Sequence, residues 1–233
     1  MTMNSPDSLL QLYGLATSSA QSSNLTSLDH PVYTAELMRE VGLKCIGFNG
    51  VPRTINCLNA FRDGLPEKIQ TELAKRKPRR TLSASNIDAA LRRGDDLWES
   101  IYRPFSDKLT KKLASSHPDM PVFIIQSEYG CLFTDPEPGA PHGADVGRVL
   151  TSVIAVACLR AQTGVGPQVL SHVFGLRKAF EDGTAEGEDL VEGGKWLASN
   201  EGSTWLLETT DSIVEAIGQG QGSSFAPGIK TKL

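Results

Sequence analysis

Two short segments of the chain combine a glycine and proline turn with a side chain that can do chemistry. The first, residues 45–57, ends with Cys57, and the second, residues 158–172, ends with His172. In both segments the reactive residue follows the turn proline by five positions, and each segment begins with a cysteine. A thiol can act as a nucleophile, and an imidazole can transfer protons near neutral pH. We interpret the two segments as copies of one helical hairpin, since a solenoid needs more repeats.

Apolar residues recur at helical spacing along most of the chain, with glycine and proline between the apolar runs. No segment has the alternation of a half-buried strand, so the predicted fold class is all-α. The strongest helix, residues 145–161, is apolar around almost its whole circumference and should lie at the centre of the molecule. Other helices are expected at residues 5–15, 31–46, 52–62, 66–75, 86–116 with a break at Pro104, 119–133, 167–182, 194–200 and 203–217.

Three parts are expected along the chain. Residues 1–30 should form an N-terminal helix and a polar loop, and residues 218–233 should form a flexible tail. Between them, residues 31–217 are expected to form one helical domain. It would consist of two related halves, at about 31–80 and 86–183, followed by the C-terminal helices.

The composition narrows the possible partners. The chain has 233 residues and a formal charge of −4, which argues against a nucleic-acid partner. The basic run at residues 75–80 is therefore interpreted as a helix end in a solvated linker, with a nuclear signal or nucleic-acid patch as the alternative. No apolar run approaches the roughly 20 residues of a membrane span, so no membrane partner is expected.

The cysteines and the ends of the sequence bear on location. Four widely spaced cysteines are typical of a reducing compartment, and the start lacks the pattern of a secretory signal. A cytoplasmic protein is therefore expected. The alternative is a peroxisomal protein, because Thr231–Leu233 reads Thr-Lys-Leu and differs by one residue type from the Ser-Lys-Leu address.

Several short motifs follow one another in the order Gly50–Asn56, Gly94–Tyr102, His117–Pro121, Glu128–Gly130, Arg148 and Gly164–His172. This ordered set resembles the carboxymuconolactone decarboxylase-like proteins, which share the alkylhydroperoxidase D-like (AhpD-like) helical fold. The resemblance covers roughly residues 32–183, about two thirds of the chain. It implies an AhpD-like helical bundle that assembles as a homo-oligomer, a trimer or larger, or as a dimer if the two halves imitate two subunits.

The chain departs from the peroxidase branch of that superfamily at the redox motif. That branch carries Cys-x-x-Cys-x-x-x-His, in which two thiols cycle through a disulfide. Counted back from His172, the cysteine positions hold Val165 and Gln168, and the upstream acidic position falls near Val153. Nothing nearby in the sequence supplies a second sulfur. The resemblance therefore favours the fold, hydroperoxide reductase is the less favoured activity, and peroxide reduction through a dithiol is not expected.

The decarboxylase branch acts on an anionic lactone acid, which implies a small-molecule substrate and requires no metal and no cofactor. His172 is the implied acid/base, and Arg53 or Arg148 would hold the substrate carboxylate. Glu40 or Glu128 would act as the protein's carboxylate. If the hairpins pack about a pseudo-twofold axis, their reactive residues should line one cavity. Further candidates are Asn56 as a hydrogen-bond donor to a carbonyl, Tyr129 for substrate binding, and Cys57 as cavity wall or nucleophile.

Each candidate also has a plain structural interpretation. His172 can be a satisfied core or interface histidine, and Cys57 can be an inert buried thiol. Arg148 can pair with Asp145 or Glu128 inside the fold. An aromatic stripe at helical spacing is expected to belong to the core, and it comprises Trp98, Tyr102 and Phe105.

Two classes of function therefore remain open. The first is an enzyme without redox cysteines that catalyses a decarboxylation, an isomerisation or a related proton transfer on an anionic organic substrate. The second is a non-catalytic AhpD-like scaffold or a subunit of an oligomer. The apolar helix at residues 145–161 favours an oligomer in either case, because one small bundle does not easily cover its whole circumference.

Overall fold

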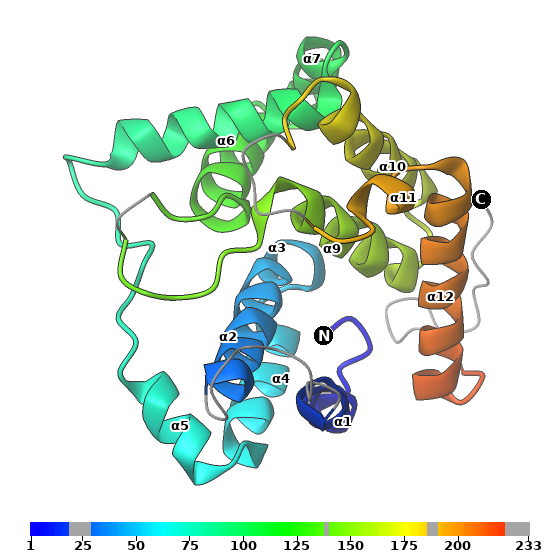
Figure 1. Cartoon of the computed structure of the whole chain (residues 1–233). Coiled ribbons are helices and arrows are strands. Elements are labelled where there is room, and N and C mark those ends of the chain that lie inside the picture. Colours follow the sequence, from blue (N-terminus) through cyan, green and yellow to red (C-terminus); the bar gives the residue numbers. More distant parts are fainter. Residues whose placement is uncertain (19–28, 138–139, 186–190, 222–233) are drawn as a thin grey trace.

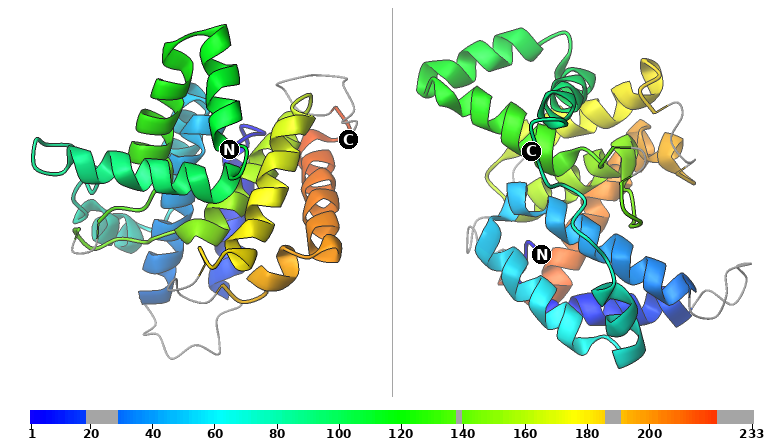
Figure 2. Two further views of the ribbon diagram at one scale, coloured as in Figure 1. Left: turned by 90° about the horizontal axis from the view of Figure 1, so that it is seen from above. Right: turned by 90° about the vertical axis from the view of Figure 1, so that its left-hand side faces the viewer.

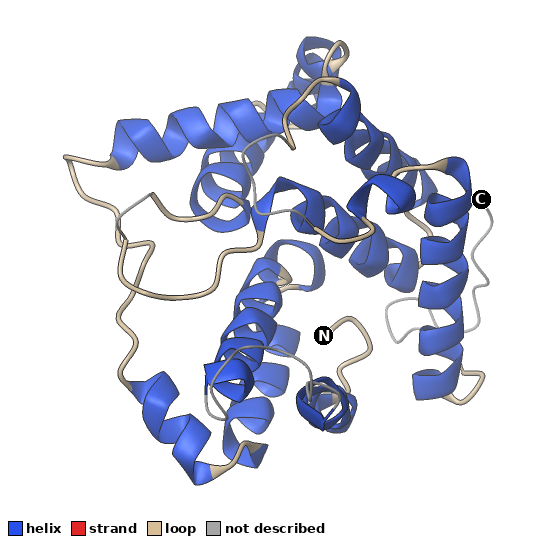
Figure 3. Ribbon diagram, in the orientation of Figure 1, coloured by secondary structure: helices blue, strands red, loops and turns tan. Residues whose placement is uncertain are grey.

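The computed structural model describes residues 1–18, 29–137, 140–185 and 191–221. Within these ranges every regular element is a helix, which confirms the predicted all-α class (Figure 3). Most of the expected polar loop and most of the expected tail lie outside the described residues. The elements are α1 (Pro6–Ser18), α2 (Asp29–Lys44), α3 (Ile46–Asn49), α4 (Val51–Gly64), α5 (Glu67–Ala74), α6 (Ile87–Tyr102), α7 (Ser106–Ser116), α8 (Asp119–Phe123), the π-helix η1 (Ile124–Phe133), α9 (Gly147–Gln162), α10 (Gly166–Glu181), α11 (Gly194–Leu197) and α12 (Asn200–Gly218).

The helices form two groups that follow the chain (Figures 1 and 2). Helices α1, α2, α4 and α5 pack on one another in the first group, and the elements from α6 onward make up the second. The first group has its own core of Tyr13, Val32, Ala35, Phe61, Leu65, Ile69 and Leu73. Helices α2 and α3 both pack on α9, and α2 also packs on η1, so these two helices contact the second group.

Helix α9 lies at the centre, as its composition predicts. Eleven of its 16 residues are buried, and α2, α3, α10 and α12 all pack against it. One chain thus covers most of the apolar circumference of α9. This helix gives no separate reason for an oligomer, so the homo-oligomer stays a prediction from the family resemblance.

The start of α9 is fixed by a buried ion pair. The Lys44 ammonium, at the end of α2, lies 3.0 Å from the Asp135 carboxylate, and the Lys44 side chain is fully buried. Asp135 also accepts hydrogen bonds from the backbone N–H groups of Val146 (3.2 Å) and Gly147 (2.6 Å). These groups outweigh the burial of Asp135 and lower the pKa of its carboxyl. The pair therefore ties α2 to the N-terminus of the central helix.

Both expected hairpins form, and both use the predicted turn chemistry. Gly50 precedes α4 with φ 80°, and Gly164 precedes α10 with φ 73°, a region in which glycine is favoured. Pro52 and Pro167 lie in the first turn of the helices that follow, where the missing N–H group costs little. The first hairpin differs by the short helix α3, which is inserted between its two long helices.

A close approach of two backbones positions the π-helix. A Cβ atom built on Gly94 in α6 would lie 2.6 Å from the backbone of Gly130 in η1, so only glycine fits there. The sequence predicts one helix over residues 119–133, whereas the structure has α8 followed by η1. The hydrogen bond from Thr134 N to Tyr129 O spans five residues and closes the wider turn. The result places Tyr129 against α6.

The basic run at residues 75–80 begins as the predicted solvated helix end, with Lys75 capping α5 and Lys77 exposed. Its three arginines, however, are paired and form a strap across α2. Arg76 pairs with Glu36 and Arg80 pairs with Glu40, one helical turn further along the same face. Arg79 pairs with Asp145 just before α9. Because Arg80 also donates to the carbonyl of Thr134 (3.3 Å), the strap connects the two groups of helices.

Replacing Arg80 with methionine is expected to lower the free energy of unfolding by about 3 kcal/mol, since it leaves the Glu40 carboxylate buried without its partner. The Arg80 and Glu40 side chains are only 18% and 11% exposed. The Arg80→Met/Glu40→Gln double variant should recover part of the loss. Denaturant unfolding measures the free energy of unfolding of the wild-type protein, the single variant and the double variant. Arg62→Met is the matched control, because its pair with Asp63 is exposed and should change stability by less than about 1 kcal/mol; equal losses in the two arginine variants would contradict this role.

Candidate functional site

His172 lies at one end of a hydrogen-bonded chain of three side chains from three elements, with Tyr102 in the middle. Its Nε2 atom, on α10, lies 3.3 Å from the hydroxyl of Tyr102, the last residue of α6. The Tyr102 hydroxyl lies 3.0 Å from the hydroxyl of Tyr129 in η1. The local sequence makes this approach possible, because Gly175 faces Ile101 and a Cβ at Gly175 would lie 2.8 Å from the Ile101 side chain. Glycine one turn after the histidine therefore lets α10 approach the end of α6.

Aromatic rings surround this chain. Phe48 of α3 makes a T-shaped contact with the imidazole at 6.2 Å between centroids, and it also stacks on Phe133 at 4.8 Å. Trp98 packs on Tyr102 at 4.2 Å and on Tyr129 at 5.1 Å. The rings hold the three polar groups in place, and His172 and Tyr129 are buried among them.

The imidazole is buried and uncharged at neutral pH. Burial and then the positive charge of Arg148 lower the pKa of His172 to about 4. Burial raises the pKa of both Tyr102 and Tyr129, so the phenols keep their protons. Within the described residues His172 Nδ1 has no hydrogen-bond partner. A buried polar atom without a partner is costly, and such atoms concentrate at functional sites.

Arg148 supports the histidine from inside the fold. Its guanidinium donates to Ser100 Oγ (2.8 Å) and to the carbonyl of Gly175 (2.8 Å), and it also contacts Ser152. Of the two predicted acidic partners, Asp145 pairs with Arg79, and the Glu128 carboxylate lies against Gly47 of α3. With these donors directed at internal acceptors, Arg148 is a buried positive charge near the imidazole.

Two further predicted residues lie beside the same aromatic cluster. Tyr129 belongs to the chain described above, and Glu128 precedes it in η1. A Cβ at Gly47 would meet both the Glu128 carboxylate and the Phe133 ring, so these groups lie together against α3. Burial raises the pKa of Glu128, and its Oε2 atom has no hydrogen-bond partner among the described residues.

The other predicted residues lie elsewhere. The Glu40 carboxylate is occupied by Arg80. Arg53 donates to the carbonyl of Thr2 (2.7 Å), and Asn56 and Cys57 both face the Asn4 side chain. The expected shared cavity of Cys57 and His172 is therefore not formed. The physical reason is the packing, since α4 lies on α1 and α2, whereas α10 lies on α9 and α6.

A groove between α7 and α10 begins at Tyr102. Its volume is about 490 Å³, and Tyr102 is the member of the hydrogen-bonded chain that lines it. The aromatic stripe is thus only partly core: Trp98 is buried, but Phe105 is 65% exposed on the wall of the groove. The remaining walls are Ile101, Leu109, Ser171, Phe174 and three lysines, Lys108, Lys112 and Lys178.

These lysines are the functional candidates that the sequence interpretation missed. Lys108 and Lys112 are four residues apart and therefore share one face of α7, a spacing that is readable from the sequence. Lys178 donates to the carbonyl of Ile101 (3.0 Å), and burial lowers its pKa. Nothing local in the sequence indicates that α7 and α10 meet at Tyr102.

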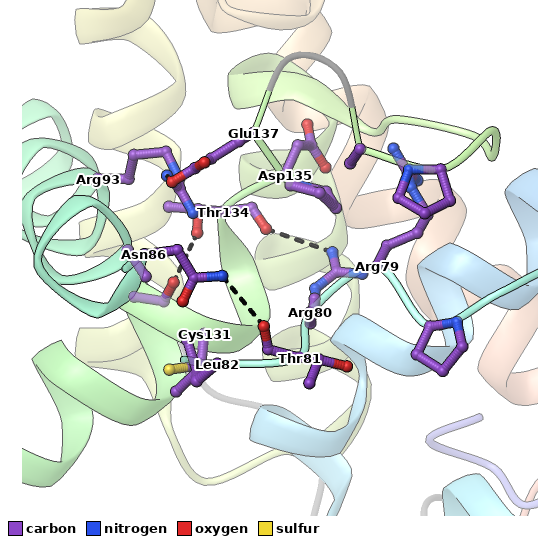
Figure 4. Close-up of a pocket in the computed structure, with 16 residues that line it drawn as sticks. Arg79, Arg80, Thr81, Leu82, Asn86, Arg93, Cys131, Thr134, Asp135 and Glu137 are labelled. Atoms are coloured by element: carbon purple, nitrogen blue, oxygen red, sulfur yellow. Dashed lines mark hydrogen bonds and ion pairs between the residues drawn. The ribbon is translucent and has the colours of Figure 1, made fainter. Parts of the chain in front are cut away.

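A second cavity, of about 330 Å³, lies between the arginine strap and η1 (Figure 4). Three arginines line it, and all are paired: Arg79 with Asp145, Arg80 with Glu40, and Arg93 with Glu137 at 2.8 Å. Asn86 donates to the carbonyl of Thr81 across its floor (3.1 Å). None of the predicted site residues lines this cavity, and its charges are largely neutralised, so the groove at Tyr102 is the better candidate for an anion.

Comparison with known proteins gives one distant similarity. No family model matches the chain, and no solved structure matches it. A curated protein that does match is peroxisomal protein 2 of Saccharomyces cerevisiae, with 27% identity over 157 residues. The match covers 59% of this chain and 52% of the yeast protein, so the chain spans about half the length of that relative. Among the described residues, no helix is long and apolar enough to cross a membrane.

Proposed function

We propose that this protein is a small-molecule enzyme of the carboxymuconolactone decarboxylase-like type, which catalyses a proton transfer on an anionic organic substrate. The observation that carries the proposal is the buried, neutral imidazole of His172, connected through the Tyr102 hydroxyl to a groove with three lysines. A neutral imidazole can accept a proton, and cationic side chains attract carboxylates.

The arrangement suggests a division of roles. Lys108, Lys112 and Lys178 would hold the substrate anion at the rim, and the apolar walls would hold its carbon skeleton. Tyr102 would contact the reacting group and exchange a proton with His172 Nε2. A bound anion near the imidazole raises its pKa, so the histidine becomes a stronger base when substrate is present.

The alternative is a non-catalytic helical scaffold or an oligomer subunit. The observation that favours it is the burial of His172, whose ring reaches the groove only through Tyr102. A histidine that serves only the core would make the same contacts with Phe48 and Tyr102.

An experiment with an extract of cellular organic acids distinguishes the enzyme from the non-catalytic scaffold. The protein and its His172→Asn variant are incubated separately with the extract, and mass spectrometry in negative mode compares the metabolites. The enzyme proposal expects an organic anion to be consumed by the wild-type protein and spared by the variant. The scaffold alternative expects identical metabolite profiles for both proteins and for a sample without protein.

We further propose a peroxisomal location, which is supported by the name of the yeast relative. The tripeptide Thr231–Leu233, which lies outside the described residues, is the segment to test. A fluorescent protein fused to the N-terminus should co-localise with a peroxisomal matrix marker, and deletion of Thr231–Leu233 should make the signal diffuse. A diffuse cytoplasmic signal with the tripeptide intact would support the cytoplasmic expectation instead.

A further inference from the structure

Two cysteines from the two hairpins meet inside the protein. Cys45 lies between α2 and α3, and Cys158 lies on α9, 113 residues later in the chain. Their sulfur atoms are 3.6 Å apart, and both residues are buried. The contact forms where the first group of helices packs on the second, so it depends on the complete fold. It also joins the cysteines that begin the two related segments.

The polar surroundings of this pair are unusual for core thiols. The side-chain amide of Asn49 donates to Cys158 Sγ at 3.7 Å. Its carbonyl oxygen accepts from Thr2 Oγ1 (3.0 Å) and from Gln162 Nε2 (3.4 Å), which fixes the orientation of the amide. A neutral thiol is only a weak acceptor, so an oriented amide contributes little to packing. It is well placed to stabilise a thiolate at Cys158.

The two sulfurs are electrostatically unequal. The hydrogen bond from Cys45 is the main cause that lowers the pKa of the Cys158 thiol, and Asn49 adds to it. The same contact and burial raise the pKa of the Cys45 thiol well above its usual value. Because the Asn49 amide donates to Cys158, Cys158 is the sulfur better placed to ionise.

We propose that Cys45 and Cys158 form a redox-active dithiol, which closes to an intramolecular disulfide when a hydroperoxide oxidises it. A disulfide needs an S–S distance of about 2.05 Å, so the sulfurs, now 3.6 Å apart, must approach by about 1.5 Å. This site uses none of the side chains assigned to the proposed acid/base function. The missing Cys-x-x-Cys predicts no peroxide reduction through a dithiol, but this pair brings two thiols together in another way. Cys45 and Cys158 are distant in the sequence and meet where α3 packs on α9.

The reaction has two steps. The Cys158 thiolate attacks one oxygen of the hydroperoxide; an S–O bond forms, the O–O bond breaks, and the alcohol leaves with the proton released by the thiol. The Cys45 thiol then attacks the sulfenic sulfur; the S–S bond forms, the S–O bond breaks, and water leaves with the Cys45 proton. Two thiols are oxidised, and one hydroperoxide is reduced to an alcohol and water.

Peptide mapping of the full-length protein tests the pair directly. The reduced protein is treated with hydrogen peroxide or tert-butyl hydroperoxide, alkylated in denaturant and digested with trypsin. Each cysteine falls in a different tryptic peptide, and the relevant ones span residues 45–53 and 149–160. We expect these two peptides to appear linked, two of the four free thiols to disappear, and dithiothreitol to reverse both changes.

Variants separate this pair from the other cysteines. Cys45→Ser and Cys158→Ser should each abolish the linked species, whereas Cys57→Ser and Cys131→Ser should leave it unchanged. Circular dichroism checks that the variants fold. If they do not fold, the peptide map of the oxidised wild-type protein shows whether Cys45 and Cys158 are linked. A 45–57 disulfide, intermolecular dimers through Cys131, or oxidation of Cys158 without a link to Cys45 would overturn the proposal. The His172 experiments are unaffected by any of these results.

Discussion

Lowering the pH from about 7 to about 4 is expected to reduce the free energy of unfolding of the wild-type protein. The reduction should be about 3 kcal/mol larger than in a variant that lacks the buried histidine. His172 has a pKa of about 4 in the folded state, because it is buried and close to Arg148. In the unfolded chain its pKa is about 6.5. Below that value the unfolded state binds a proton that the folded state does not. The stabilisation is therefore complete above about pH 6.5 and is lost progressively as the pH falls to about 4.

Denaturant unfolding of the wild-type protein and His172→Gln over this pH range measures the contribution. Other groups titrate as well, and Glu128 acts in the opposite direction because its pKa is raised. They are present in both proteins, so the difference between the two curves isolates the histidine. His117→Gln is the matched control, since His117 is exposed, and its curve should run parallel to the wild type. Parallel curves for His172→Gln would refute a buried neutral imidazole.

Turnover is expected to fall by about 10²–10⁴-fold in His172→Ala once a substrate is identified, because a positioned acid/base typically contributes that much. Tyr102→Phe should lower kcat as well, since it removes the hydroxyl between the imidazole and the groove. The phenylalanine ring keeps the contact with Trp98, so the fold should be preserved. Steady-state kinetics at pH 7 separate the effects on kcat from those on KM.

Tyr33→Phe provides the control for Tyr102→Phe, because Tyr33 is exposed on α2 and outside the groove. Its kinetics should match the wild type. Lys112→Met should raise KM with little effect on kcat if the lysines hold the substrate anion. Full kcat in both His172→Ala and Tyr102→Phe would place the chemistry elsewhere and leave the three-residue chain with a structural role.

The elements of this fold are readable from the sequence because their causes are local. Helical spacing of apolar residues, together with proline at the start of a helix and glycine at its turn, predicts both hairpins and the central position of α9. The break at Pro104 also occurs where expected, between α6 and α7. His172 can be singled out in the same way, since its distance from Pro167 repeats that of Cys57 from Pro52.

Which residues come together in the site was decided only by tertiary packing. Tyr102 and His172 are 70 residues apart, and their contact depends on α10 approaching α6 at Gly175. Cys57 is turned away from His172 because α4 packs on α1, a choice that helical spacing does not contain. The basic run looked solvated because its partners, Glu36 and Glu40, lie 40 residues earlier in the chain.

The contact between Cys45 and Cys158 also could not be predicted from the sequence. The sequence places one cysteine at the start of each related segment, which is a local signal. It does not state that α3 rests on α9 with the two sulfurs in contact. Local sequence determines which face of a helix is apolar, because that follows from spacing along one helix. Which helices bring those faces together depends on the packing of the whole chain, and that packing assembled the hydrogen-bonded chain at His172 and the thiol pair.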